Sequence, residues 1–541
     1  MWPSADGIRP RNSGEAEDAF QAVKAPQIAP LWGRCYNADM NFPAHPSSSP
    51  EATPLDPSGR PRGIGRRVLL NTGALAGSSL WRIVLSFVLQ ILIANRLGEV
   101  GLGQYATALA YLNVTQILSS LGLPMLLVRD LARAPQERRR HFHLALVVQI
   151  LAGVLAWAGL VGLTLLLPYQ PTTRLALVII GASLPLFAVT SVSETIFQAG
   201  ERMELVMGVE MTVNSLILAL SLLVLWRGGT VVHLAGVMVL TQSVSAALCL
   251  TLLARSRLLT GAGSGWGLAR LAGDLAGLLR RAAPFYGLTL ANVLLQRLDI
   301  LLLSVLAGEA ITGIYSAAYL VVRVLIILSQ TYWQALYPTL SRLRHQAPEQ
   351  YRRLAVLGLR YGLMLLLPAA ALGAATGEGI LALLFSAEGY QASAPVFRVL
   401  IWTAPLFFVS TYAVNLLLVE RLPGQSLFIV GAHLLALVLL LPPLVRSGQA
   451  LGAAAAMTGA IAVSMVTGLL LLRGVRAPLG PGRPLLFLLL ATGLTLAVAS
   501  LAPLIWPLRI LLGGAVYLAL VWWSGVLAPW DLRLFRRALQ R

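Results

Sequence analysis

The amino-acid sequence predicts an all-α polytopic membrane protein with about 14 transmembrane helices, arranged as two parallel six-helix lobes plus a C-terminal helix pair. Three observations lead to this fold class. The chain is 57% hydrophobic and only 12% charged, with a mean hydropathy of +0.75, which is more apolar than a soluble domain can shield from water. Its apolar runs form a nearly unbroken series from about residue 68 onward. Two short motifs each occur twice, which indicates an internal duplication.

The duplication is visible in two pairs of segments. Gly98–Tyr105 and Gly308–Tyr315 share the pattern G-E-x-x-x-G-x-Y, and Pro185–Ser191 is similar to Pro405–Thr411. The two pairs keep the same order and nearly the same offset, 210 and 220 residues. We expect the repeated glycines to bound short outward turns between consecutive helices. We expect the repeated prolines to kink corresponding helices.

Windows of about 20 apolar residues mark the individual membrane crossings. The first twelve windows divide into two groups of six, and the last two have no counterpart in the repeat. The predicted helices are 70–95, 103–127, 144–167, 174–198, 204–226, 231–254, 284–306, 312–337, 354–384, 394–418, 424–445, 450–472, 484–504 and 508–528.

The placement of arginine predicts the orientation, because basic loops remain on the cytoplasmic side. Several arginines precede the first helix, follow helices two, six, eight and twelve, and close the chain. The alternate loops together hold only five, namely Arg96, Arg174, Arg227, Arg446 and Arg509. The sequence therefore predicts a multi-pass protein of the cell (inner, cytoplasmic) membrane with both termini cytoplasmic. Because the loops account for most of the net charge of +19, we expect no nucleic-acid partner.

An even number of helices separates the two copies of the repeat, so both lobes face the same way in the bilayer. The N-terminal tail, about residues 1–66, is rich in Pro, Ser, Gly and Ala and resembles no signal peptide, so we expect it to be disordered. The alternative is that the start codon is misassigned and the tail is not translated. The linker between the two lobes interleaves leucines with arginines, as does a helix that lies on a membrane surface. The alternative is a plain solvated connection. The predicted parts are 1–67, a disordered cytoplasmic tail; 68–256, the N-lobe; 257–283, the amphipathic linker; 284–473, the C-lobe; and 474–541, the last helix pair and a basic tail.

Polar faces occur on the first, second, seventh and eighth helices, which are corresponding pairs of the two halves. Polar groups at membrane depth are costly and usually line a cavity or have a partner. We therefore expect an aqueous cavity between the lobes, made positive by its arginines and suited to a phosphate or another anion. The candidate substrate-binding residues are Arg82, Gln90, Asn292, Gln296, Arg297, Asp299, Arg323 and Gln330.

These polar residues also have plainer interpretations. The arginines can hydrogen-bond helix backbones or pair with Asp299, although Arg297 lies roughly 200° from Asp299 around a helix. Asp299 can instead carry a proton or bind a coupling cation. Glu194 and Glu210 lie toward helix ends, and packing or gating explains them more simply than contact with substrate.

The sequence contains no pattern of an enzyme or a metal site. Cys35 and Cys249 lie far apart, the six histidines are scattered, and no catalytic or phosphate-binding motif is present. A membrane glycan polymerase or ligase would need a sizeable outer loop, whereas the longest outer connection, 376–394, offers little beyond Glu378 and Glu388. We expect no enzymatic activity, no cofactor and no metal.

The segment Asn95–Tyr105 resembles the first-loop signature of bacterial polysaccharide-export flippases, and Arg297–Ile300 followed by Gly313–Ala318 is similar to the same signature in the second half. These flippases form the polysaccharide transporter branch of the multidrug/oligosaccharidyl-lipid/polysaccharide exporter superfamily. The resemblance covers about residues 68–528 in helix count, order and lobe division. The tail at 1–66 has no place in the family pattern.

The resemblance implies a V-shaped flippase that moves an undecaprenyl-pyrophosphate-linked oligosaccharide from the inner to the outer leaflet by alternating access, for polysaccharide export. In that family a cationic cavity holds the pyrophosphate and sugar while the lipid tail stays in the bilayer; Arg82, Arg297 and Arg323 match this role by location. The implied partners are the lipid-linked oligosaccharide, membrane lipids, and polysaccharide polymerase or assembly proteins. The alternative is a cation-coupled multidrug exporter of the same superfamily, which typically has twelve helices.

Overall fold

The computed structural model describes residues 64–133, 138–256, 258–259, 268–385, 388–474 and 482–524. The chain divides into two units, Met1–Gly65 and Arg66–Arg541. The predicted disorder of residues 1–67 and the basic tail after the last helix fall almost entirely outside the described residues, as does part of the predicted linker.

Helices make up nearly all of the described chain, and no strand occurs among these residues. The elements are α1 (Ile64–Ser120), α2 (Leu123–Arg133), α3 (Arg138–Leu166), α4 (Pro171–Gly181), α5 (Leu184–Ala199), α6 (Met203–Trp226), α7 (Val231–Ser256), α8 (Leu268–Gln346), α9 (Pro348–Leu384), η3 (Glu388–Ala392), α10 (Ser393–Leu400), α11 (Thr403–Val419), α12 (Pro423–Gly474), α13 (Gly482–Leu501) and α14 (Trp506–Trp523).

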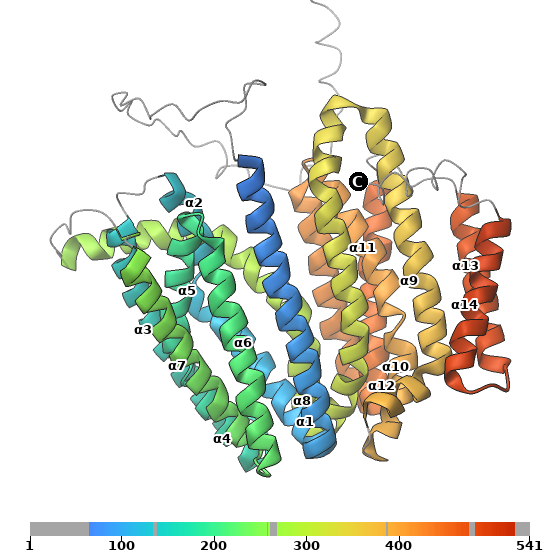
Figure 1. The fold of residues 1–541 in the computed structure, drawn as a ribbon, viewed down its shortest axis with the longest axis horizontal. Coiled ribbons are helices and arrows are strands. Elements are labelled where there is room, and N and C mark those ends of the chain that lie inside the picture. Colours follow the sequence, from blue (N-terminus) through green and yellow to red (C-terminus); the bar gives the residue numbers. More distant parts are fainter. Residues whose placement is uncertain are drawn as a thin grey trace, which may run out of the picture. The chain divides into compact units, whose positions relative to one another are not determined.

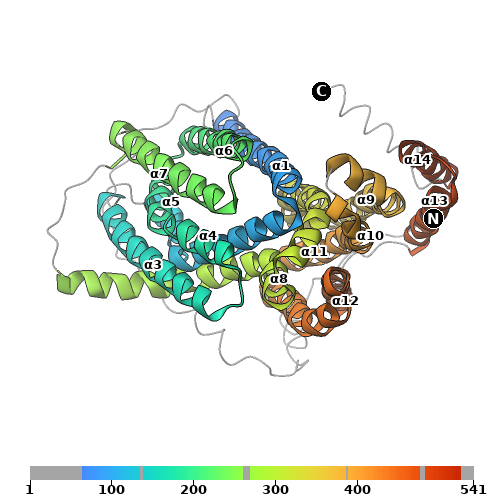
Figure 2. The ribbon, with the colours of Figure 1, turned by 90° about the horizontal axis from the view of Figure 1, so that it is seen from below.

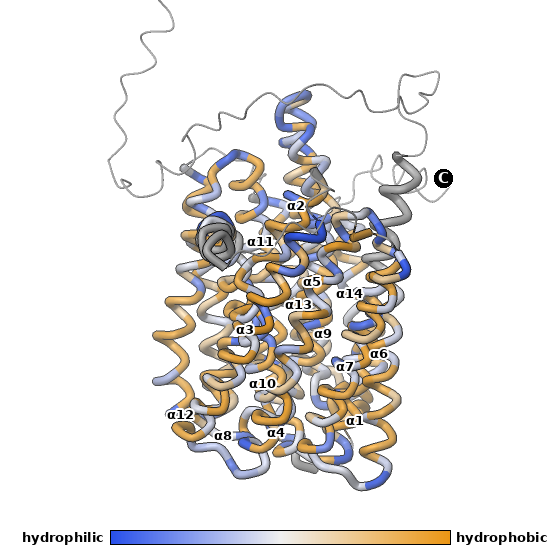
Figure 3. The backbone as a smooth tube through the Cα atoms, turned by 90° about the vertical axis from the view of Figure 1, so that its left-hand side faces the viewer, coloured by the Kyte–Doolittle hydropathy of each residue, from blue (hydrophilic) through white to orange (hydrophobic). Residues whose placement is uncertain are grey.

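Eleven stretches of the described chain are long and apolar enough to cross a membrane. Three of them, in α1, α8 and α12, hold two helices joined at a sharp break, at Gly98, Gly308 and Gln449 respectively. The described residues therefore contain fourteen crossings, and the predicted all-α membrane fold is confirmed. Figure 3 shows hydrophobic residues along the lengths of the helices and hydrophilic residues gathered toward their ends.

The repeat has a direct structural counterpart in the two breaks. Gly98 (φ 69°, ψ −170°) and Gly308 (φ 80°, ψ −177°) adopt almost the same left-handed conformation, which favours glycine because it lacks a Cβ. The predicted turns at these two glycines are confirmed. Gly103 and Gly313 do not bound the turns as predicted; they lie inside the helices that follow.

The repeated prolines also occupy matching places. The fourth predicted helix is divided into α4 and α5, with Pro185 in the first turn of α5. The tenth is divided into α10 and α11, with Pro405 in the first turn of α11. Because proline cannot donate a backbone hydrogen bond to the preceding turn, the helix restarts at the proline in both halves, as the sequence predicted.

Buried apolar side chains form three clusters. One belongs to the first half and includes Leu123, Phe142 and Phe197. Another belongs to the second half, where Trp333 and Phe408 pack with ring centroids 4.9 Å apart. The third joins the halves around the broken helices α1 and α8. Figures 1 and 2 show α3–α7 on one side and α9–α12 on the other, with α13 and α14 packed beside α9, while the first part of α8 extends beside α3–α7.

The first part of α8 falls on the predicted amphipathic linker. It runs across the direction of α3–α7 in Figure 1, and the membrane-crossing stretch begins at Thr289. Leu279 packs against the first-half cluster while Arg280 and Arg281 are exposed. Arg281 forms an ion pair with Asp130 beyond the second crossing, at 3.3 Å. The amphipathic character of the whole linker stays a prediction, since most of its side chains lie outside the described residues.

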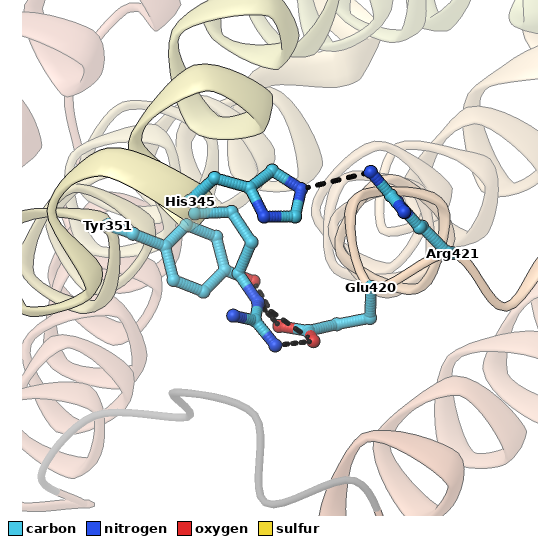
Figure 4. Close-up of polar contacts among 5 residues, drawn as sticks. His345, Tyr351, Glu420 and Arg421 are labelled. Carbon is cyan, nitrogen blue, oxygen red and sulfur yellow. Dashed lines mark hydrogen bonds and ion pairs between the residues drawn. The ribbon is translucent and has the colours of Figure 1, made fainter.

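The two ends of the bundle differ in composition. We call the end that holds Arg129, Arg281 and Arg344 the arginine-rich end, and the opposite end, at Gly98 and Gly308, the repeat end. At the arginine-rich end Arg344 donates paired hydrogen bonds of 2.8–3.0 Å to the carboxylate of Glu420, just after α11. The Tyr351 hydroxyl donates a further hydrogen bond of 3.0 Å to the same carboxylate, as Figure 4 shows.

Glu420 titrates abnormally because of these contacts. Burial alone would raise the pKa of its carboxyl, but the hydrogen bonds from Arg344 and Tyr351 and the positive charge of Arg344 outweigh burial and hold the pKa below its ordinary value. Beside this cluster, Arg421 approaches His345 Nε2 at 3.4 Å (Figure 4). These contacts fasten the hairpin between α8 and α9 to the end of α11.

Candidate functional site

A large cavity lies within the bundle, with a volume of about 700 Å³. Its walls come from both parts of α1 and of α8 and from α5, α6 and α7. It falls within the range of roughly 300–1,000 Å³ that is common for small-molecule sites. The sequence predicted a cavity between helices one, two, seven and eight, and the structure adds three helices of the first half to that wall.

Most of the predicted site residues face this space. Six of the eight predicted residues line it, namely Arg82, Gln90, Gln296, Arg297, Arg323 and Gln330. They come from α1 and α8, the two helices that carry the repeat. Whether they contact a substrate remains a prediction.

The three arginines make no direct hydrogen bond or ion pair inside the described part of the protein, although Glu194 is a charged neighbour of Arg82 and Asp299 of Arg297. No hydrogen bond or ion pair occupies the guanidinium group of Arg82, Arg297 or Arg323 there. Arg323 is a charged neighbour of Arg297, so two like charges face the same cavity. Arg82 is exposed to the cavity, and the other two are half-buried. Unpaired guanidinium groups beside one another in a largely apolar bundle are suited to an anion supplied from outside.

Asp299 lies apart from the cavity lining. Its side chain is 1% exposed, and it accepts a hydrogen bond of 2.7 Å from the hydroxyl of Tyr315. Its other oxygen, Oδ1, has no hydrogen-bond partner among the described residues. Tyr315 stacks on the cavity residue Tyr319 with ring centroids 5.9 Å apart. Asp299 therefore lies behind the arginine wall, bonded to a tyrosine rather than paired with an arginine.

Asn292 also lies outside the cavity lining, although Gln296 on the same predicted stripe is part of it. Before the break at Gly308, the face of α8 that lines the cavity consists of Val293, Gln296, Arg297 and Ile300. This face is rotated by roughly 70° from the stripe that polar spacing predicts. The rotation brings Arg297 into the cavity and turns Asp299 toward Tyr315.

Five helices contribute polar groups, and those of α5, α6 and α7 were not among the predicted site residues. Glu194 lines the cavity, and its charged neighbours are Glu210 and Arg82. Gln242 donates a hydrogen bond of 2.9 Å to Thr190 in the same wall. The charged groups of the lining are thus three guanidinium groups and two carboxylates. The signal for Glu194 and Glu210 was present, since each is a carboxylate at membrane depth.

Metal-ligand geometry is not found in the described ranges. No cluster of three or more His, Cys, Asp or Glu side chains is placed to hold a metal ion there. Cys249 is a buried free thiol in α7.

Comparison with solved structures identifies the fold. The lipid II flippase MurJ in an inward closed conformation superposes with a TM-score of 0.65 at 12% sequence identity, covering 86% of this chain and 99% of that one. An inward-facing multidrug resistance MATE family transporter of the MOP superfamily gives 0.61 at 13% identity, covering 72% and 94%. The MATE multidrug transporter DinF-BH gives 0.52 at 15% identity, covering 77% and 97%.

Sequence comparison identifies the family. None of the proteins with curated functions matches the chain. The profile of the family described as polysaccharide biosynthesis protein matches residues 68–344, which is more than half of the chain. This segment spans the first six crossings, the linker and the two crossings of α8, and so holds every lining residue of the cavity. The chain is therefore a multi-pass membrane protein of the polysaccharide biosynthesis protein family, with the fold shared by MurJ and MATE transporters.

Proposed function

We propose that this protein is a flippase that moves an undecaprenyl-pyrophosphate-linked oligosaccharide from the inner to the outer leaflet of the cytoplasmic membrane by alternating access. The observation that carries the proposal is the group of three unpartnered arginines, Arg82, Arg297 and Arg323, facing one cavity in the described part of the chain. The family assignment connects that cavity to polysaccharide biosynthesis. In this proposal the protein moves its substrate without making or breaking covalent bonds.

The chemistry of the cavity suits a diphosphate joined to sugar. Guanidinium groups bind phosphate oxygens through paired, charge-assisted hydrogen bonds. Gln90, Gln296 and Gln330 provide amide groups that can donate to and accept from sugar hydroxyls. The lipid tail would remain in the bilayer, since its transfer into this polar space would be unfavourable.

The direction of transport follows from charge in this proposal. The arginine-rich end faces the cytoplasm if basic loops remain inside, and the head group then enters the cavity from that end. Membrane lipids surround the protein, and polysaccharide polymerase or assembly proteins are the partners expected to receive the product.

Export of an organic cation is the second candidate. Glu194 and Glu210 place two carboxylates in the cavity lining, and a carboxylate pair attracts cations. Three arginines in the same lining oppose this interpretation, because the remaining net charge is positive.

Reconstitution into vesicles separates the two candidates. Purified protein in proteoliposomes is given a fluorescent undecaprenyl-pyrophosphate oligosaccharide, and a membrane-impermeant glycosidase measures the fraction that crosses the bilayer. A parallel set of vesicles is tested for uptake of ethidium, a fluorescent organic cation. We expect movement of the lipid-linked glycan and no uptake of ethidium. Uptake of ethidium without glycan movement would contradict the proposal.

A further inference from the structure

The second glycine of the repeated motif lies where the two halves meet. A Cβ atom placed on Gly103 would overlap the backbone carbonyl of Glu309 and come within 2.8 Å of Gly313 N. A Cβ atom placed on Gly313 would overlap the carbonyl of Glu99 and lie 3.1 Å from Gly103 N. The contact is therefore reciprocal: each glycine receives the backbone of the glutamate that belongs to the other copy. No residue with a side-chain carbon fits at either position in this arrangement.

The contact between Gly103 and Gly313 lies at one end of the cavity. On α1 the lining stops at Gln90 and resumes at Tyr105, and on α8 it stops at Ile300 and resumes at Ser316. The chain between these limits contains the breaks and both glycines. The repeat thus closes the repeat end of the cavity, and its backbone contact leaves no room for solvent between the two helices.

Hydrogen bonds between the two halves surround this glycine contact. The carboxylate of Glu309, only 6% exposed, accepts hydrogen bonds from the hydroxyl of Thr173 at 2.6 Å and from the backbone N–H of Gln170 at 3.1 Å. Both donors belong to the start of α4 in the first half. A third hydrogen bond between the halves joins Tyr169 to Ser304 at 2.7 Å.

The other copy of the motif is fastened in a corresponding manner. Asn95 donates a hydrogen bond of 3.0 Å to the carbonyl of Leu384 at the end of α9. Tyr390, in η3, donates a longer one of 3.4 Å to the carbonyl of Ala94. Hydrogen bonds therefore join the two halves beside both copies of the motif.

We propose that the two copies of the G-E-x-x-x-G-x-Y motif form a gate at the repeat end, sealed by the reciprocal contact of Gly103 and Gly313 and held shut by the Glu309 carboxylate. The gate rests on the proposed alternating access, because a substrate admitted at the arginine-rich end can leave only when this seal parts. Its two-fold arrangement lets both halves separate together. Substitution of either glycine should exclude the closed state and shift the population toward the open one.

The test measures the distance across the repeat end. Nitroxide labels are attached at Thr230→Cys and Ser447→Cys, two exposed positions in the turns of opposite halves, in full-length protein carrying Cys35→Ser and Cys249→Ala. Double electron–electron resonance then gives the distance distribution in membranes. Gly103→Ala and Gly313→Ala should each raise the ratio of the longer-distance population to the shorter one by at least about tenfold, a change of ~1.4 kcal/mol.

A matched control and a second variant make the test decisive. Gly236→Ala, a helical glycine with nothing within 4 Å of an added Cβ, should leave the distribution unchanged. If the gate glycine variants fail to accumulate, the variants Glu309→Gln and Thr173→Val are measured in their place. Each should raise the longer-distance population severalfold. An unchanged distribution in the variants that do accumulate would overturn the gate.

The distance measurement does not depend on the substrate. If the distances respond as expected while the vesicles move no lipid-linked glycan, the gate stands and the proposed substrate falls. If the glycan moves while the distances do not respond, the proposed function stands without this gate.

Discussion

At the scale of single residues, the protein exposes three guanidinium groups to its cavity that make no ion pair or hydrogen bond among the described residues. A guanidinium group within a membrane protein is expensive unless it has a partner or a water-filled space. Arg82, Arg297 and Arg323 have the space and lack the partner among the described residues. Such an arrangement stabilises a bound anion more than it stabilises the empty protein.

The first prediction concerns these arginines one at a time. Arg82→Ala, Arg297→Ala and Arg323→Ala should each lower the rate of glycan movement in proteoliposomes by about 10- to 100-fold, since each removes a charge-assisted hydrogen bond of about 1.5–3 kcal/mol. Membrane abundance should stay unchanged, because none of the three holds the fold together. Arg227→Ala, at the exposed end of α6, is the control and should retain full activity. Full activity in Arg82→Ala and Arg297→Ala would remove the basis of the cavity assignment.

The sequence identified the arginines but not the carboxylates opposite them. Spacing along one helix shows which residues share a face, and so Gln296 and Arg323 could be placed toward a cavity. It does not show which neighbouring helix turns the same way. Glu194 and Glu210 lie on different helices, and only the packing of α5 against α7 and α6 brings them into the lining. For the same reason the rotation of α8 that hides Asp299 was not predictable.

At the scale of elements, local signals were sufficient for nearly all of the fold. Apolar windows marked the crossings, Gly98 and Gly308 marked two breaks, and Pro185 and Pro405 marked two restarted helices. Each signal acts through backbone geometry within a few residues. The role of Gly103 and Gly313 was not visible in this way, because it depends on a contact between segments 210 residues apart in the chain.

The second prediction concerns the cluster of Arg344, Tyr351 and Glu420 at the arginine-rich end, which we call the Glu420 clasp. Arg344 and Glu420 are 39% and 11% exposed, so Glu420→Gln should lower the free energy of unfolding by about 1–2 kcal/mol at pH 7. Because the pKa of Glu420 is depressed in the folded protein, the contribution is present above the ordinary pKa of 4.5 and is lost as pH falls through the depressed value. The difference in Tm between wild type and variant should therefore shrink on acidification to about pH 4 and below.

A second ion pair provides the comparison for that measurement. Arg398 and Glu378 are 49% and 70% exposed, and solvent screens such pairs strongly. Glu378→Gln should change Tm little at either pH. Equal effects of the two substitutions would contradict the role given to the Glu420 clasp.

At the scale of the whole molecule, the duplication gives both the architecture and the asymmetry of the protein. The repeat brings α1 and α8 together as equivalent helices, and both contribute arginines to the cavity. The remaining lining comes only from the first half, through α5, α6 and α7. The site is therefore built on the repeat but is not itself symmetric, which suits a substrate with chemically different ends.

The third prediction concerns the N-terminal segment. Removal of residues 1–60 should leave glycan movement in proteoliposomes within about twofold of the full-length rate, because the family match begins at residue 68 and the cavity lining begins at Ser79. Full-length protein in the same vesicles is the reference. A loss of transport by the shortened chain at normal abundance would show that the tail has a function of its own.

The proposed transport depends on binding of the glycan's diphosphate by the cavity arginines, and an affinity measurement tests this binding without the transport step. Affinity for a short-chain, water-soluble prenyl diphosphate sugar can be measured by calorimetry on purified protein, with the Arg82→Ala/Arg297→Ala double variant and the Arg227→Ala control. We expect wild type and control to bind alike and the double variant to bind about 100-fold or more weakly, from two lost charge-assisted contacts. Equal affinity in the double variant and the wild type would show that these arginines do not hold the diphosphate.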